Sequence, residues 1–339
     1  MDKVVSSLDE KRDSLPAGEA PEDIIWIITS ACNLNCPYCY AKSYSGQEEL
    51  PSDVVLRLLD EACDAGVSQV NFTGGEPLLR RDILQILRKT VDLGMEATLF
   101  TNLTMMDDEK AEELYRMDVY VLTSLDGPKE VYERAKSLGS WERFMRGIKL
   151  LRRHGIPFHV NIPLSKVNFN VVADAIMEAE RIEASSISMI PSMEFGSSVR
   201  TRSFITKDEF ISALKLADRT SEELGLMVSV WCAPFLGILG LRNLRYGNCR
   251  NWSVMDISPG GKVLVCDVMN VEVADVREGI DKAWRKLQEH PLMRKARELP
   301  EECKSCPISN ICLGGCYARA YNRWRRLPSP DPLCPRVSS

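Results

Sequence analysis

From Ile24 to about Pro191, short runs of apolar, often β-branched residues alternate with segments whose apolar residues recur every three or four positions. The short runs predict buried strands, and the longer segments predict amphipathic helices. Such regular alternation is typical of a parallel sheet covered by helices. Six strands are predicted, at residues 23–29, 67–77 (with a glycine turn), 96–102, 119–127, 156–163 and 185–191.

Helices are predicted between these strands, at residues 52–66, 80–94, 107–117, 128–136, 141–155 and 170–182. Six strand–helix units are too few for the closed barrel of eight. We therefore expect an α/β fold, an open partial (β/α)6 barrel. In such sheets, ligands bind at the carboxyl ends of the strands.

The rhythm changes after Pro191. A long helix at 206–225 and a strand at 226–231 are still predicted, but from Tyr246 onward the periodicity weakens while cysteines become dense. A segment that buries little apolar surface is often stabilised by metal. We therefore expect a poorly ordered tail at 1–22, the barrel at 23–225, and a bridging region with a small cysteine-rich domain at 226–339.

Composition and charge exclude several classes of protein. The formal charge is −5 and the pI is about 5.5, so no basic footprint for nucleic acid is present. No apolar run reaches the ~18 residues of a membrane span, and the polar, acidic N-terminus lacks the apolar core of a signal peptide. We expect a cytoplasmic protein with neither nucleic acid nor a membrane as partner.

The chain has twelve cysteines and only three histidines. A reducing compartment keeps thiols reduced, so their spacing indicates metal chemistry rather than disulfides. Cys32, Cys36 and Cys39 fall within eight residues directly after the first strand. Three thiolates can hold three irons of a [4Fe–4S] cluster and leave the fourth iron bare. An open metal position is characteristic of catalytic sites, although a partial zinc site is the alternative.

The spacing C-x3-C-x2-C, with Tyr38 before the last cysteine, resembles the radical S-adenosylmethionine (radical SAM) superfamily. In that family the motif "TGGEP", here residues 73–77, follows the second strand and receives the methionyl amino group. The resemblance implies that S-adenosylmethionine binds this first cluster. The residues that it implies at the cofactor are Tyr38, Gly74, Gly75, Glu76, Pro77, Thr101, Asn102, Ser124 and Asp126. For the last four, ordinary turn chemistry accounts for the residue types equally well.

A second cysteine pattern lies in the tail. It begins with Cys249, and Gly261 stands shortly before the next cysteine, Cys266. A C-x2-C-x5-C-x3-C run then begins at Cys303. This pattern resembles the SPASM extension of radical SAM enzymes, which carries two auxiliary [4Fe–4S] clusters. The resemblance assigns the outer cluster to Cys303, Cys306, Cys312 and Cys334, and the inner cluster to Cys249, Cys266 and Cys316. A zinc ribbon is the alternative for the whole tail.

The inner cluster is one ligand short in this assignment. Cys232 is a candidate for the fourth thiolate. The alternative is that one iron stays open to substrate and that Cys232 is a buried thiol that binds no metal. Cys63 lies inside a predicted helix, where a small buried hydrophobe is expected. Arg319, Arg323, Arg325 and Arg326 form a basic run that predicts a solvated helix face, or else a fork that binds carboxylates.

The resemblance also implies a reaction. Its cofactors are S-adenosylmethionine and three [4Fe–4S] clusters, one that binds S-adenosylmethionine and two that are auxiliary. Its partner is a low-potential electron donor such as ferredoxin or flavodoxin. Reductive cleavage of S-adenosylmethionine gives a 5′-deoxyadenosyl radical, which abstracts a hydrogen from substrate. Asp267 directly follows Cys266. In sulfatase-maturing relatives an aspartate at this position looks to serve as the base that removes a proton, so the resemblance implies this role for Asp267. A carboxylate bonded to nearby backbone is the alternative role.

We interpret the chain as a radical SAM oxidoreductase that oxidises or crosslinks a peptide or protein side chain. Only residues 1–31 precede Cys32, so we expect no N-terminal peptide-recognition domain, which keeps a tetrapyrrole-modifying enzyme as the main alternative. A non-catalytic iron–sulfur carrier is a third interpretation. The intact "TGGEP" argues against it, because a carrier has no use for an S-adenosylmethionine pocket.

Overall fold

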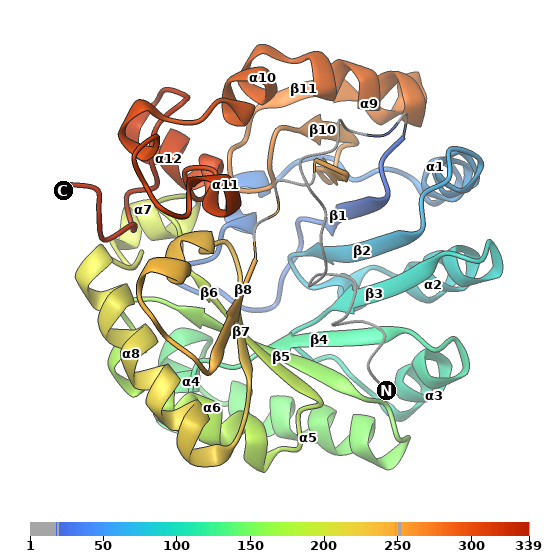
Figure 1. Cartoon of the computed structure of the whole chain (residues 1–339). Helices are drawn as coiled ribbons and strands as arrows, with labels where there is room; N and C mark the ends of the chain where they lie inside the picture. Colours follow the sequence, from blue (N-terminus) through green and yellow to red (C-terminus); the bar gives the residue numbers. More distant parts are fainter. Residues whose placement is uncertain (1–17, 19, 248, 250–251, 339) are drawn as a thin grey trace.

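The computed structural model describes residues 18, 20–247, 249 and 252–338. Within these residues the strands form one curved sheet of eleven, in the order β11-β10-β9-β1-β2-β3-β4-β5-β6-β7-β8. Its two edge strands, β11 and β8, do not pair with each other among the described residues, so the sheet stays open (Figure 1). The predicted α/β partial barrel is confirmed.

The six predicted strands are all present and pair in parallel, in chain order. Their side chains are mostly buried, which agrees with the near-continuous apolar runs expected of a sheet covered by helices. Their bounds are β1 Asp23–Thr29, β2 Gln69–Gly74, β3 Glu96–Phe100, β4 Tyr120–Ser124, β5 Phe158–Leu164 and β6 Ser186–Pro191.

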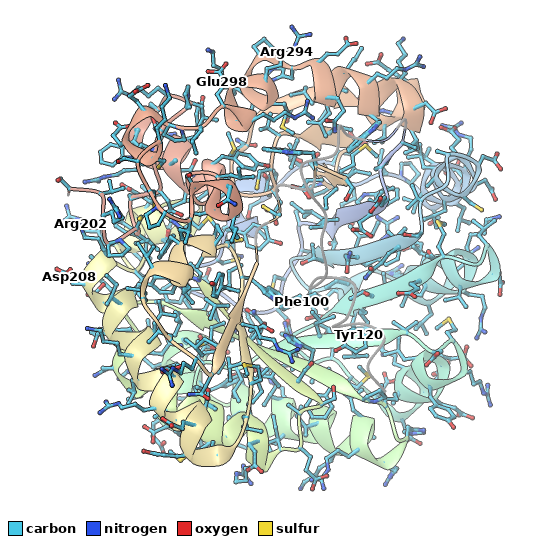
Figure 2. All side chains as sticks on the ribbon, in the orientation of Figure 1. Phe100, Tyr120, Arg202, Asp208, Arg294 and Glu298 are labelled. Carbon is cyan, nitrogen blue, oxygen red and sulfur yellow. The ribbon has the colours of Figure 1, made fainter. Side chains whose placement is uncertain are left out.

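Helices cover the outer, convex face of the sheet, and Figure 2 shows their charged side chains pointing outward, such as Asp208 on α8. Thr206 and Glu209 form a capping box at the start of α8, and left-handed Gly225 ends it. The predicted helices are confirmed as α1 Ser52–Asp64, α2 Ile83–Asp92, α3 Asp108–Arg116, α4 Lys129–Ala135, α5 Ser140–Arg153, α6 Val172–Arg181 and α8 Lys207–Leu224.

Five short strands extend the sheet beyond the predicted barrel. Two continue it past β6, and three pair outward from β1, of which β9 runs parallel to β1. They are β7 Val228–Val230, β8 Leu244–Tyr246, β9 Val254–Ile257, β10 Lys262–Leu264 and β11 Glu272–Asp275. Only β7 was predicted; β8 and the three strands beyond β1 were not, because strands of three or four residues are too short to show a period of two. The three strands beyond β1 attach part of the cysteine-rich segment to the edge of the barrel.

The remaining helices are short. They are α7 Ser197–Thr201, α9 Ile280–Glu289, α10 Pro291–Arg297, α11 Ser309–Cys312 and α12 Tyr317–Trp324. In Figure 1, α9 and α10 lie beside β11, while α11 and α12 lie near α7; Figure 2 shows Arg294 pointing outward from α10. Among the described residues, no helix combines the length and the apolar character needed to cross a membrane.

The division into domains at residue 225 remains a proposal, since strands on both sides of it belong to one sheet. Of the predicted tail at 1–22, residues 1–17 and 19 lie outside the described part of the chain.

His159 on β5 is buried inside the barrel and serves the packing there. Its ring nitrogens lie 2.7 Å from Ser186 Oγ and 2.6 Å from Ser188 Oγ, and the ring stacks on Trp231 at 5.3 Å between centroids. Burial lowers the pKa of His159 to about 4, so the folded protein holds this ring neutral where the unfolded chain protonates it.

This burial predicts a pH dependence of stability. Between the unfolded pKa of about 6.5 and the folded value, the unfolded chain binds more protons, so stability falls as pH falls. From pH 7.5 to pH 5, His159 should account for a loss of about 2 kcal/mol. Urea unfolding of the wild type and His159→Gln across this range measures it. Parallel pH profiles for the two proteins would contradict the assignment.

Candidate active site and cysteine clusters

Cys32, Cys36 and Cys39 lie in the loop that follows β1, and their thiols are brought together. Burial is the main reason that the pKa of Cys36 is raised to about 12; the charge of Lys136 opposes the rise, while the negative charges of Asp126, Cys39 and Cys32 contribute to it because they would repel the thiolate. The loop is turned by a bond from the Cys39 N–H to the Cys36 carbonyl, at 3.3 Å. A group of neighbouring, half-buried thiols fits a cationic iron cluster, which binds thiolates and removes their mutual repulsion.

Glu49 and Arg80 hold the start of this loop, and neither was predicted from the sequence. The Glu49 carboxylate accepts from the Ser30 N–H at 3.0 Å and from the Thr29 hydroxyl. The Arg80 side chain, 7% exposed, donates to the Ile28 carbonyl at 3.0 Å. These contacts fix the exit of β1, so they position the first cysteine through the backbone.

The double glycine of "TGGEP" packs directly on the start of the cysteine loop. The Gly75 N–H donates to the Thr29 carbonyl at 2.9 Å, and the Glu76 N–H donates to the Ala31 carbonyl at 2.8 Å. A Cβ on Gly75 would lie 2.0 Å from the Ala31 oxygen, and one on Gly74 would lie 2.4 Å from the Thr29 oxygen. The resemblance implies these glycines at the cofactor, which stays a prediction. In the structure they allow close approach of two backbones.

Gly75→Ala should therefore destabilise the fold. The added methyl group meets backbone rather than a flexible side chain, so the two loops must separate, at a cost of about 3 kcal/mol. Gly247 offers the matched control, because no atom lies within 4 Å of its added Cβ and its φ is not in the left-handed region. Chemical unfolding of Gly75→Ala and Gly247→Ala compares them. If Gly75→Ala and Gly247→Ala were equally stable, the two loops would accommodate the added methyl group without strain, and the prediction would be wrong.

Glu76 is fully buried, and its carboxylate is the centre of a bonded cluster. It accepts from the Thr101 hydroxyl at 2.6 Å, the Asn102 N–H at 2.7 Å and the Leu78 N–H at 3.0 Å. Burial raises the pKa of Glu76, and these three donors oppose the rise. A carboxylate offers about four acceptor positions, so capacity for one further donor remains. Pro77 begins the single turn that follows.

Asn102 connects this cluster to the cysteine loop, since its Nδ2 donates to the Asn33 side-chain oxygen at 3.0 Å. The structure thus brings Glu76, Thr101 and Asn102 together beside the three cysteines. Their contact with S-adenosylmethionine stays a prediction.

Tyr38, Ser124 and Asp126 meet around Lys136, a residue that the sequence analysis missed. Lys136 Nζ lies 2.8 Å from Ser124 Oγ, 3.0 Å from the Tyr38 hydroxyl and 3.3 Å from an Asp126 carboxylate oxygen. The Tyr38 hydroxyl also donates to Asp126. Lys136 directly follows the last residue of α4 and comes four positions after the buried Tyr132. A lysine in line with the apolar face of a helix was therefore the signal in the sequence that could have identified it.

Cys232, Cys249, Cys266 and Cys316 form a second group of neighbouring thiols. The neighbouring Cys232 thiol, helped by the charge of Arg319, lowers the pKa of Cys316 to about 7 although the Cys316 thiol is buried. The Cys316 thiol and burial, with the charge of Cys249, raise the pKa of Cys232. Burial, the charges of Asp267 and Asp256, and then that of Cys316 raise the pKa of Cys266. Cys232 therefore lies with the predicted inner set.

Cys303, Cys306, Cys312 and Cys334 line one hollow beside α11, together with Pro330 and Asp331. Burial raises the pKa of Cys312 to about 12, with Asp331 and Cys334 adding to it. Four thiols around a common space fit the ligand set of a complete [4Fe–4S] cluster. The predicted outer set is brought together, and its metal remains a prediction.

Asp267 lies between the two cysteine regions. Its N–H donates to the Asp256 carboxylate at 2.8 Å, and its carbonyl accepts from the Tyr44 hydroxyl at 2.6 Å. The hydroxyl of Tyr40, one residue after Cys39, lies 3.3 Å from Thr73 Oγ1 and is near enough to the Asp267 carboxylate to oppose the rise of its pKa. Burial raises the pKa of Asp267 to about 6. Asp256 was missed in the sequence, where the signal was one carboxylate inside the apolar run 254–257.

The arginines of the basic run near the C-terminus have different environments in the structure. Arg319 is buried and pairs with Asp331, so the expected solvated helix face is wrong for this residue. The alternative interpretation of a carboxylate-binding fork applies to it, with a carboxylate of its own chain. Arg323 is half exposed and lies 3.6 Å from Glu194. Cys63 donates to the Leu93 carbonyl within the barrel, away from both cysteine groups.

Residues 26–177 match the Radical SAM superfamily. The AdoMet-dependent heme synthase of Methanosarcina barkeri is 27% identical to this chain, over 93% of it and 96% of that protein. The PqqA peptide cyclase of Granulibacter bethesdensis is 26% identical, over 93% of this chain and 87% of its own length. The structure of native anSMEcpe with bound AdoMet and Cp18Cys peptide shares the fold, with a TM-score of 0.73, 19% identity and coverage of 93% of both chains.

Residues 26–177 therefore form a radical SAM domain. The cysteine-rich C-terminal part of the chain is of the SPASM type. A radical SAM domain implies S-adenosylmethionine and a [4Fe–4S] cluster as cofactors. The relatives include a heme synthase and a peptide cyclase, so they give the class of chemistry and leave the substrate open.

Proposed function

We propose that this radical SAM enzyme uses three [4Fe–4S] clusters to oxidise or crosslink a peptide or protein side chain. The observation that carries the proposal is the position of Asp267. It is a half-buried carboxylate that directly follows the inner-cluster cysteine Cys266 and neighbours Tyr40, the residue after the first-cluster cysteine Cys39. A proton acceptor beside an electron acceptor is what a two-electron oxidation of a substrate requires.

The bound cluster and S-adenosylmethionine supply one-electron cleavage of the sulfonium and abstraction of a substrate hydrogen. Cys32, Cys36 and Cys39 would hold the first cluster and leave one iron open. Gly74, Gly75 and Glu76 would orient the methionyl group, while Thr101 and Asn102 hold the Glu76 carboxylate. Lys136, with Ser124 and Asp126, would fix Tyr38 within the first cysteine loop and exclude water from it.

Asp267 would take the proton that the oxidised substrate loses. Its raised pKa of about 6, caused by burial, suits a general base that works near neutral pH. Asp256 holds the backbone of Asp267 by accepting from its N–H, and Tyr40 is a neighbour of the Asp267 carboxylate. The inner set of Cys232, Cys249, Cys266 and Cys316 would accept the electron, and the outer set would pass it to a carrier such as ferredoxin or flavodoxin.

A second candidate is the oxidative decarboxylation of a tetrapyrrole side chain. It is favoured by the 27% identity to a heme synthase over 96% of that protein's length. Loss of carbon dioxide releases the substrate electron without removal of a proton. This candidate therefore uses the same clusters but gives Asp267 no role as a base.

Both candidates are tested with anaerobically reconstituted protein, dithionite and S-adenosylmethionine. The proposal predicts release of 5′-deoxyadenosine, with a peptide that contains Ser or Cys losing two hydrogens by mass spectrometry. Carbon dioxide release from a propionate-bearing tetrapyrrole, with the peptides unchanged, would favour the second candidate. Absence of 5′-deoxyadenosine with every substrate would indicate an iron–sulfur carrier and overturn both.

A further inference from the structure

Arg319 is a buried cation beside the inner group of cysteines. It lies on α12, and its side chain is 4% exposed. Its Nε and Nη2 bind the two Asp331 oxygens at 2.8 and 2.6 Å, and Nη2 also donates to the Cys232 carbonyl at 2.6 Å. A bidentate, charge-assisted pair of this kind holds the planar guanidinium in one orientation.

One nitrogen of the same guanidinium has a different environment. Arg319 Nη1 is buried and has no hydrogen-bond partner among the described residues. Leaving a buried donor of a charged group unsatisfied is costly, and such atoms are rare in folded proteins. The neighbours whose charges act on the guanidinium are Asp331, which the other nitrogens bind, and the thiols of Cys316 and Cys232. The unsatisfied donor therefore belongs to the surroundings of the inner cysteines.

Asp331 touches both cysteine groups. One of its oxygens accepts from the N–H of Cys316 at 2.8 Å, in the inner group, and its carbonyl accepts from the N–H of Cys334 at 3.0 Å, in the outer group. The residue is fully buried and forms part of the hollow of the outer cysteines. Asp331 packs closely against the backbone of Gly315, since a Cβ added to Gly315 would lie 2.3 Å from the Asp331 Cβ. The Arg319–Asp331 pair thus stands between the two groups.

We propose that Arg319 tunes the inner auxiliary cluster, with Nη1 donating to a sulfur of that cluster and Asp331 fixing the guanidinium between the two clusters. This proposal rests on the proposed function, which places a cluster at the inner cysteines. Reduction potentials of iron–sulfur clusters rise with hydrogen bonds to sulfur and with nearby positive charge. Arg319 therefore makes the inner cluster a better acceptor for the electron that leaves the substrate. It acts through the cluster and is a positioning residue.

Asp331 should act in the opposite direction. Its negative charge near both clusters opposes their reduction, and its removal makes reduction easier. A merely structural pair would not give shifts of opposite sign for its two members. The signs of the two shifts are therefore the critical readout.

The test is a potentiometric titration of reconstituted protein, followed by EPR, with the iron content measured beside it. Arg319→Gln should retain the iron and make reduction of the inner cluster at least tenfold less favourable, a shift of about 59 mV downward for one electron. Asp331→Asn should shift the inner potential upward. Arg323→Gln is the matched control, because it removes a half-exposed positive charge from the same helix and should leave the potential unchanged.

Arg319→Lys is the second variant in case Arg319→Gln does not hold iron. Lysine keeps the charge but cannot bind Asp331 through a fork and reach the cluster at once, so its potential should lie below that of the wild type. Unchanged potentials in the iron-loaded Arg319 variants, or shifts of one sign for Arg319→Gln and Asp331→Asn, would overturn the inference. A wild-type protein with only one cluster's iron would instead overturn the proposed function.

Discussion

Cys36→Ala should abolish the cleavage of S-adenosylmethionine. The three thiols of the first loop are the ligands available to that cluster in the proposed site, and loss of one leaves two. Even outer-shell substitutions at metal sites reduce affinity or activity by 10–100-fold, so the release of 5′-deoxyadenosine should fall more than about 100-fold. The iron content should fall by one cluster while the auxiliary clusters remain, which Mössbauer or absorbance spectra can measure.

Cys63→Ala is the control for this experiment. Cys63 lies on α1 and bonds only to the Leu93 carbonyl among the described contacts. Its removal should leave both the iron content and 5′-deoxyadenosine release within the error of the wild type. Retention of full activity by Cys36→Ala would contradict the assignment of the first cluster.

Asp267→Asn should separate the two halves of the reaction. The residue does not belong to the first cluster, so release of 5′-deoxyadenosine should stay within about twofold of the wild type. Formation of the oxidised product should fall by 10²–10⁴, the typical range for removal of a general base. The comparison is the ratio of product to 5′-deoxyadenosine under single-turnover conditions.

The outcome also depends on what else the carboxylate does. The Asp267 carboxylate accepts from the Cys266 thiol at 3.5 Å, and Asp256 accepts from the Asp267 N–H, so iron content is measured for the variant as well. Simultaneous loss of S-adenosylmethionine cleavage, product and iron would identify Asp267 as a structural residue. Unchanged product with a tetrapyrrole substrate would fit the decarboxylation candidate, in which no proton is removed.

The barrel could be predicted from the sequence because its strands are long enough and apolar enough to stand out. Phe158–Leu164 is buried at every position, and an apolar run of this length between two amphipathic helices is typical of a central strand in a covered sheet. The motifs were equally clear, since the cysteine spacing and "TGGEP" each depend on local residues. The structure then brought Glu76, Thr101 and Asn102 together as their places at the ends of neighbouring strands predicted.

Other features could not be predicted because they depend on contacts between distant segments. Asp256 meets Asp267 only through the pairing of β9 with β10, two strands too short to recognise in the sequence. Lys136 and Arg319 each resembled an ordinary charge on a helix, and only the fold shows that they are buried beside Asp126 and Asp331. The packing of the "TGGEP" glycines on the β1 loop likewise could not be predicted, because the atoms near their missing Cβ belong to a segment distant in the sequence.

The central claim is that the first cluster presents a bare iron to S-adenosylmethionine. The most direct measurement is the EPR spectrum of the dithionite-reduced protein, recorded with and without S-adenosylmethionine. We predict that the signal of one cluster changes when the cofactor is added, that the signals of the others do not, and that Cys36→Ala lacks the responsive signal. A spectrum that the cofactor leaves unaltered, or a colourless protein that contains zinc in place of iron, would contradict the account.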